Sequence, residues 1–257
     1  MGETMRPAAT GFRQPPSAVH DGAGFADLLR LNPLFEPLRD HQIAPLVALA
    51  RDAQFPANAV ICRQGELPRH LHLLTDGQVA LWATASDGTH AVVEVIQPPG
   101  YFVLASVLTR LPYLTTARAI CASRMILIEA EGLHALLDGG GALANVLLRA
   151  QALSFRSLLR QVEDLKMRTA AQRLGCYLLA LAGDTTAAVA HFRLPFDKGL
   201  LAARLGCRQE NLSRAFATLR NSGVETHGSR VILHDIPTLR TYAVPSENTD
   251  PGLQFSG

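Results

Sequence analysis

The chain has 257 residues, of which 48% are hydrophobic and 18% are charged, and its formal net charge is +2 at pH 7. This balance is typical of a globular protein and excludes an intrinsically disordered chain. No run of about 18 apolar residues occurs, so we expect no transmembrane helix and no membrane partner. Residues 1–24 lack the apolar core of a secretory signal, and the widely spaced cysteines include no CxxC pair. Together these features predict a cytoplasmic protein with reduced thiols and no cysteine-bound zinc or cluster.

Charge is distributed unevenly along the chain. Residues 25–138 contain 8 Arg and no Lys against 11 acidic residues, which gives −3. Residues 168–243 contain 10 Lys and Arg against 5 acidic residues, which gives +5. A basic C-terminal module beside a mildly acidic N-terminal one is expected of a DNA-binding domain with a separate control domain.

The N-terminal half begins with a loose tail, residues 1–24, rich in Pro, Gly, Ala and Ser. From Phe25 apolar residues recur at helical spacing, and residues 43–50 form a second short amphipathic pattern. Between residues 55 and 129 short apolar runs follow one another at spacings of 10–12 residues, with glycines at the corners. This texture predicts a small antiparallel β-barrel or β-roll, which we assign as a sensor domain over residues 25–138.

Three glycines at 139–141 end this domain, and a helical pattern follows for about 25 residues. Its apolar stripe has spacings of three and four, so residues 139–167 are predicted to form a dimerisation helix. The alternative is that the stripe packs on its own barrel. The residues assigned to the dimer interface are Leu148, Phe155, Leu158, Val162 and Leu165. The helical pattern continues from Leu165 to Ala182.

Residues 198–219 have the pattern of a helix-turn-helix. Leu201, Leu205 and Leu212 fall where the two helices must pack together, and Gly206 falls in the turn, where a positive φ costs glycine little. The second helix would bury Leu212, Ala215, Phe216 and Leu219. Its other face would offer five candidate DNA contacts: Arg208, Gln209, Glu210, Ser213 and Arg214. Arg pairs with guanine and Glu with the cytosine amino group, so these side chains suit a major groove.

An ordinary solvated helix of an all-α domain could show the same pattern. The following residues favour DNA binding, because 224–227, a Gly228-Ser229 turn and 230–234 predict a short hairpin. The hairpin completes a winged helix-turn-helix over residues 168–243, followed by a polar C-terminal tail, residues 244–257.

In order, these parts resemble the CRP/FNR family of bacterial transcription regulators over roughly residues 25–243. Arg63-Gln64-Gly65-Glu66, the stretch 71–79 and Pro98-Pro99-Gly100-Tyr101-Phe102 are similar to family landmarks of the sensor domain. Glu210-Asn211-Leu212-Ser213-Arg214 is similar to the E-x-x-S-R recognition helix of one branch. The resemblance implies an α+β fold: a cyclic-nucleotide-binding-like β-roll, a long dimerisation helix and a winged helix-turn-helix. It also implies a homodimer on TTGAT-like palindromes of double-stranded DNA, with RNA polymerase as a partner if the protein is an activator.

The effector is less closely defined. Members that bind cAMP carry a Gly-Glu pair and an Arg-Ser/Thr-Ala run, whereas this chain has Val103-Leu104 and Leu114-Thr115 there. Without the arginine a cyclic phosphate loses its charge-assisted bond, so we expect no cAMP. No cysteine precedes Cys62, which argues against the iron–sulfur cluster of the FNR type. The remaining resemblance is to the DNR/NnrR branch, which implies nitric oxide sensing through haem.

Under this reading the effector pocket would include His72, Val103, Leu104, Leu114 and Thr115. No motif marks an axial ligand for haem. The candidates are His41, His70, His72, His90 and His134.

Two alternatives stay open for control of DNA binding. Cys207 lies beside Arg208 at a predicted helix N-terminus, where a thiol pKa should fall, so the regulator could respond to oxidation. The regulator could also work without an effector. We expect no enzyme, because metal-holding barrels use a His-x-His pair with a later Glu and His, a combination that we do not expect in this chain.

Overall fold

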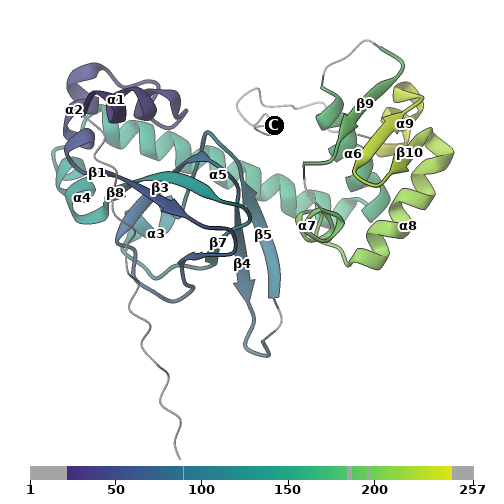
Figure 1. Ribbon diagram of the computed structural model, residues 1–257, viewed down its shortest axis with the longest axis horizontal. Coiled ribbons are helices and arrows are strands. Elements are labelled where there is room, and N and C mark those ends of the chain that lie inside the picture. Colours follow the sequence, from purple (N-terminus) through teal and green to yellow (C-terminus); the bar gives the residue numbers. More distant parts are fainter. Residues whose placement is uncertain (1–21, 89, 184–186, 196, 245–257) are drawn as a thin grey trace, which may run out of the picture.

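The computed structural model describes residues 22–88, 90–183, 187–195 and 197–244. The predicted tails, 1–24 and 244–257, lie almost wholly outside the described residues. A β-roll stands at one end of the molecule and a smaller helical module at the other, and one long helix joins them (Figure 1). The predicted fold class is confirmed.

The roll consists of two four-stranded antiparallel sheets that face each other. Alternate residues of each strand point between the sheets, and this interior contains Leu74, Leu81, Phe102 and Leu127. The first sheet has the order β1 (Ala50–Phe55), β8 (Ser123–Glu129), β3 (His70–Asp76) and β6 (Gly100–Phe102). The second has the order β2 (Val60–Cys62), β7 (Thr116–Ala119), β4 (Val79–Thr84) and β5 (His90–Ile96).

Helices pack on the outer face of the first sheet, and several elements of this region, strands β1 and β6 among them, were not predicted from the sequence. The helix expected over 43–50 is α2 (Asp40–Ala48), and Ala50 already begins β1, paired with Ile128. Two short helices, α3 (Leu104–Thr109) and α4 (Ala130–Asp138), also went unpredicted. The first helix, α1 (Gly22–Leu31), packs with α2. A strand as short as β1 is defined by its pairing partner more than by its own composition.

The long helix α5 (Ala142–Met167) does not continue to Ala182 as the pattern predicted. Arg168 is extended, and Thr169 is the N-cap of a new helix, α6 (Ala170–Ala182). The Thr169 hydroxyl accepts from the Gln172 backbone N–H at 3.2 Å, and Gln172 Oε1 accepts from the Thr169 N–H at 3.0 Å. This capping box satisfies two free N–H groups, so a break here costs little.

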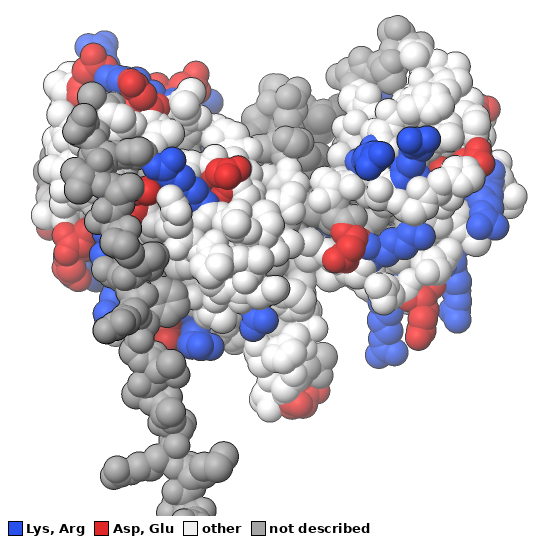
Figure 2. Space-filling model, in the orientation of Figure 1, with Lys and Arg blue, Asp and Glu red and all other residues white. Residues whose placement is uncertain are grey.

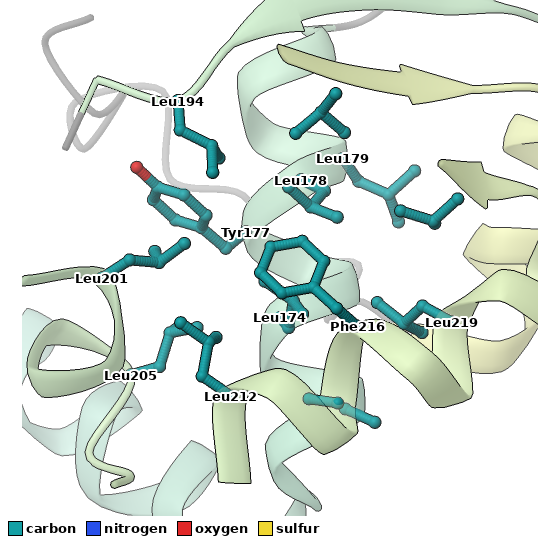
Figure 3. Packing of buried hydrophobic residues seen from close by; sticks show 14 of the residues in the cluster. Leu174, Tyr177, Leu178, Leu179, Leu194, Leu201, Leu205, Leu212, Phe216 and Leu219 are labelled. Carbon is teal, nitrogen blue, oxygen red and sulfur yellow. The ribbon is translucent and has the colours of Figure 1, made fainter. Parts of the chain in front are cut away.

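The C-terminal module packs four helices against a three-stranded sheet. Its core is formed by Leu174, Leu178, Leu201, Leu212 and Leu219, all at most 1% exposed (Figure 3). The helices are α6, α7 (Lys198–Arg204), α8 (Gln209–Leu219) and α9 (Ile236–Ala243), with a 3-10 turn, η1, at Arg220–Ser222. The sheet has the order β10 (Val224–His227), β11 (Arg230–Leu233) and β9 (Ala190–Arg193).

The roll and the module touch each other through β5 and α7. Val92 and Val95 share one apolar cluster with Tyr177 and Leu201. Arg204 Nη1 donates to the Val95 carbonyl at 3.4 Å, and its guanidinium carbon lies 5.8 Å from the centre of the Tyr177 ring. These contacts fix where the recognition helix stands relative to the roll.

Candidate nucleic-acid interface and effector site

The two helices of the predicted helix-turn-helix meet as expected. Leu201 and Leu212 are 1% exposed and Leu205 is 8% exposed, so all three lie in the core between the helices. Gly206 has a φ of +61° in the turn between α7 and α8. The Asp197 carboxylate caps α7 by accepting from the Leu200 N–H at 2.8 Å. The local sequence therefore produces the bend that presents α8.

All five predicted DNA contacts lie together on the solvent side of α8 or at its start. Arg208 is the N-cap, and it, Gln209, Glu210, Ser213 and Arg214 are exposed. The apolar residues predicted for the opposite side, Leu212, Ala215, Phe216 and Leu219, are buried. Basic side chains project from this edge of the module (Figure 2). Arginines with an intervening carboxylate on a protruding helix suit the major groove of DNA.

Two of these side chains are partly engaged within the protein. The Ser213 hydroxyl donates to the Gln209 carbonyl at 3.1 Å, so its lone pairs remain free to accept. Gln209 Nε2 lies 3.2 Å from the place that a Cβ on Gly199 would occupy. Gln209 therefore packs against the start of α7, whereas Glu210 and Arg214 are exposed on the helix.

The wing carries a polar cluster that the sequence interpretation missed. The two oxygens of the Glu225 carboxylate lie 2.7 Å from His227 Nε2 and 2.7 Å from His234 Nε2. These hydrogen bonds lower the pKa of Glu225. Together with Arg220 the three side chains line a surface cleft beside α8. Glu225 and His227 are two residues apart on β10, so their side chains point to the same face of the strand. This spacing in the sequence could have predicted that they lie close together.

The apolar stripe on α5 divides into two parts. Leu143, Leu147 and Ala150, at the beginning of the helix, are buried against the roll. The five residues assigned to the dimer interface are 47–69% exposed: Leu148, Phe155, Leu158, Val162 and Leu165. Such a run of exposed apolar side chains is rare on a monomer and indicates an interaction surface.

The end of α5 is tied to the recognition module by arginines. Arg168 forms an ion pair with Asp164 and donates to the Val244 carbonyl at 2.9 Å. Arg173 donates through Nε to the Leu205 carbonyl at 2.9 Å and through Nη1 to the Arg168 carbonyl at 2.7 Å. A movement of α5 would therefore be passed directly to the turn of the helix-turn-helix.

The five predicted effector residues do not form one pocket, which corrects the sequence interpretation. His72 is 4% exposed and belongs to β3. Leu104 is buried, but it packs with the helices outside the first sheet. Leu114 is 78% exposed, Thr115 is half-buried, and Val103 has a φ of +60° just before α3. The neighbour of Leu114, Tyr113, is the residue that turns inward, and its hydroxyl accepts from the Arg69 N–H at 3.3 Å.

Of the histidine candidates, only His70 and His72 are associated with the roll interior among the described residues. Arg51 Nη2 lies 2.7 Å from His70 Nε2. Burial lowers the pKa of His72 to about 3, and burial with the nearby Arg51 lowers that of His70 to about 4. His134 Nε2 lies 2.8 Å from the Val107 carbonyl, His90 Nδ1 lies 3.1 Å from the Thr84 hydroxyl, and His41 is exposed.

His70 and His72 also form a His-x-His pair, so the expectation that the chain lacks this pair is wrong. Within the part of the chain that the structure describes, no group of three or more His, Cys, Asp or Glu side chains is arranged to hold a metal ion.

Cys207 lies just before α8, as expected, but its environment does not activate the thiol. Burial raises its pKa, and the opposing influence of Arg173 is smaller. The expectation of a lowered pKa at this helix N-terminus is therefore wrong. Of the four cysteines, Cys121 alone is exposed.

These features define a class of protein: a sequence-specific DNA-binding regulator with a separate β-roll domain. Residues 53–139 match the cyclic nucleotide-binding domain family, and residues 172–242 match the Crp-like helix-turn-helix domain family. Together the two matches span more than half of the chain, in the family's order. The chain belongs to the CRP/FNR family of transcription regulators.

Individual relatives agree with this assignment. The chain is 21% identical over 206 residues to the CRP-like cAMP-activated global transcriptional regulator of Mycobacterium tuberculosis, covering 79% of this chain and 92% of that protein. The crystal structure of a candidate cyclic nucleotide binding protein from Ruegeria pomeroyi is similar with a TM-score of 0.59 and 28% identity, covering 88% of this chain and 100% of the other. FixK2 from Bradyrhizobium japonicum shares the fold, with a TM-score of 0.63 at 20% identity over 75% and 96% of the two chains. Across the described residues, every helix is too short or too polar to cross a membrane.

Proposed function

We propose that this regulator binds palindromic DNA as a homodimer. The observation that carries the proposal is the pair of free surfaces on one chain, the polar face of α8 and the apolar stripe of α5. Pairing two α5 helices would remove exposed side chains such as Phe155 (61%) and Val162 (47%) from water. A two-fold dimer would place two α8 helices on half-sites about one helical turn of DNA apart.

Within each half-site we propose that Glu210, Ser213 and Arg214 contact the bases of a TTGAT-like sequence. Their common exposure on α8 and the E-x-x-S-R resemblance support this assignment. Arg214 would bind a guanine through two hydrogen bonds, a contact worth about 1–3 kcal/mol of discrimination.

The test compares wild type with Arg214→Ala and Arg214→Lys on the palindrome and on a version with that guanine replaced. We expect both variants to lose discrimination, because lysine keeps the charge but not the fork of donors. Arg240→Ala, at an exposed site on α9, is the control and should bind like wild type. Unchanged discrimination in Arg214→Ala would refute the assignment.

We further propose that a small effector in the roll, other than cAMP, gates DNA binding. By resemblance, Leu104 and Leu114 stand in the stretches where cAMP-binding members carry a glutamate and an arginine, which supports control without a cyclic phosphate. Haem with nitric oxide, the mode of the DNR/NnrR branch, is one candidate. Its axial ligand would be His72, whose Nδ1 is buried without a hydrogen-bond partner among the described residues. The ring stacks on Phe102 at 4.8 Å, so haem binding would require the roll to open.

A haem titration of the purified protein, followed by nitric oxide under anaerobic conditions, tests this candidate. One saturable Soret band per subunit that shifts with nitric oxide and is lost in His72→Leu is the expected result. DNA binding that needs no ligand would instead favour the alternative, a regulator of the same family that is effector-independent or controlled through Cys207. In either case we propose that the protein acts in the cytoplasm, with RNA polymerase as a partner if it activates transcription.

A further inference from the structure

A polar cluster of three basic side chains lies beside the apolar core in the interior of the roll. Four residues lie directly opposite one another across the first sheet. Arg51 of β1 pairs with Leu127 of β8, and Leu127 pairs with His72 of β3. His72 in turn pairs with Phe102 of β6. Residues directly opposite each other in antiparallel strands project to the same face. Leu127 and Phe102 lie in the core between the sheets, so Arg51 and His72 project to that side as well.

His70 completes the cluster, two residues before His72 on the same side of β3. Because a guanidinium can only donate, the 2.7 Å contact from Arg51 Nη2 makes His70 Nε2 an acceptor. The His70 ring is therefore neutral, and it stands edge-on to the His72 ring with centroids 6.3 Å apart. The cluster thus has one fixed positive charge, on Arg51, and two neutral imidazoles.

Two nitrogens of this cluster lack partners. Arg51 Nε and His72 Nδ1 are buried, and neither has a hydrogen-bond partner among the described residues. Only 4% of the His72 surface is exposed to solvent. The third such atom, Trp82 Nε1, belongs to a side chain that packs with the C-terminal module instead.

The charge of Arg51 is unbalanced as well. In the described part of the chain its guanidinium forms no ion pair, whereas the next residue, Asp52, is paired with Arg124 at 2.8 Å. A half-buried guanidinium with a free Nε and no carboxylate is costly unless something supplies negative charge and acceptor atoms.

We propose that Arg51, His70 and His72 form the binding site of a small monovalent oxyanion or carboxylate inside the roll. The anion would accept from Arg51 Nε and from His72 Nδ1 and would balance the charge of Arg51. Its access would be from β1, the edge strand of the first sheet, where Arg51 is only partly buried. This inference rests on the proposed function, because it gives the effector of the roll a chemical class.

Binding would reach the rest of the molecule through Phe102. That residue stacks on His72 and is followed by Val103, whose left-handed backbone is unfavourable for a β-branched residue. Val103 is the N-cap of α3, and it packs against both the interior core and the core under the helices. A shift of the His72 ring therefore has a direct path to the helices that surround α5.

Calorimetric titration of the full-length protein with sodium formate and sodium acetate tests the proposal, with sodium chloride holding ionic strength constant. We expect one saturable site per chain. Affinity should fall at least tenfold in Arg51→Gln and in His72→Leu and remain unchanged in Arg118→Gln, which removes an exposed arginine of β7. No saturable binding up to about 50 mM, or equal binding in all variants, would overturn the proposal. The sodium chloride screens weak binding of the anions to exposed surface charges much more than binding at a buried site.

A second measurement uses the unaltered protein in case a variant does not fold. The imidazole resonances of His72 should shift during the formate titration with the same dissociation constant as the heat. Binding without any shift at His72 would also reject the site. DNA binding is measured separately on the palindrome. Formate binding without DNA binding would reject the proposed function and keep this site. DNA binding without formate binding would keep the proposed function and reject this site.

Discussion

The Cδ2 atom of Leu165, near the end of α5, lies 2.5 Å from the position that a Cβ atom on Gly206 would occupy. The helix assigned to dimerisation therefore touches the turn of the helix-turn-helix at a point where a side chain on residue 206 would have to displace Leu165. Leu165 remains 51% exposed, so the same residue is available to a partner. The position of the turn, and with it the direction of α8, is thus coupled to the packing of α5.

Gly206→Ala should destabilise the C-terminal module for two reasons. The φ of +61° costs an L-residue about 1–2 kcal/mol, and the new methyl group would also overlap Leu165. Gly228→Ala is the matched control, because its φ is +62° and nothing lies within 4 Å of its Cβ position. In urea unfolding we expect Gly206→Ala to lose more stability than Gly228→Ala, and Leu165→Ala to relieve the excess. Equal losses would show that the contact with Leu165 is not rigid.

Phe155→Glu should turn the proposed dimer into monomers. Its side chain is 61% exposed in the single chain and would be buried in a paired seam, where an unpaired carboxylate is strongly unfavourable. Gln161→Glu adds the same charge at an exposed polar position of α5 and should leave the mass unchanged. Sedimentation equilibrium measures both. A Phe155→Glu protein that stays dimeric would place the dimer interface elsewhere.

Stability should fall as the pH is lowered below about 6.5. Burial lowers the pKa of His70 to about 4 and that of His72 to about 3, from 6.5. Between these values the unfolded chain binds more protons than the folded one, so protonation favours unfolding and stability rises with pH. Each group contributes a slope of up to about 1.4 kcal/mol per pH unit.

His72→Leu should remove one of these contributions, whereas replacement of the exposed His41 by Gln should not. Urea unfolding between pH 4.5 and 7 gives the slopes. Identical slopes in wild type and His72→Leu would mean that His72 is accessible to protons in the folded state.

Cys121 should be the first thiol to react with iodoacetamide. It is exposed, whereas Cys62 is buried with a pKa raised by burial to about 11. Cys207 is half-buried with a raised pKa, so its thiolate fraction at neutral pH is small. Mass spectrometry of peptides after brief labelling measures the order, and Cys121→Ser should abolish the fast phase. Faster labelling of Cys207 would restore the case for redox control of DNA binding.

The C-terminal module could be predicted closely because its determinants are local. Leu201, Leu205 and Leu212 meet across a short turn, and Gly206 supplies the positive φ that the turn needs. The exposed face of α8 follows from helical periodicity once its apolar side is known. Most strands of the roll were found in the same way, from apolar runs and glycine corners, whereas β1 and β6 were not.

Other features depended on contacts that no local pattern encodes. The break between α5 and α6 is an exception, because the Thr169–Gln172 capping box that begins α6 is a local signature that the sequence interpretation passed over. Leu114 was expected to point inward, but Tyr113 is buried and Leu114 is exposed. The reason is that the Tyr113 backbone is hydrogen-bonded to the backbone of Gly65 and Glu66.

The cluster of Arg51, His70 and His72 is the clearest case. Arg51 and His72 are 21 positions apart in the chain. Their strands, β1 and β3, do not pair with each other, and each pairs with β8, which lies about 50 residues further along the sequence. Their register depends on the burial of the whole sheet, since a shift by one residue would turn every side chain to the other face. The sequence alone thus determined the order of the domains and the apolar and exposed sides of α8, through short-range periodicity and turn chemistry, and its motifs carried the resemblance to the family. Only the tertiary structure decided which polar groups are enclosed in the roll, because long-range strand pairing brings them together.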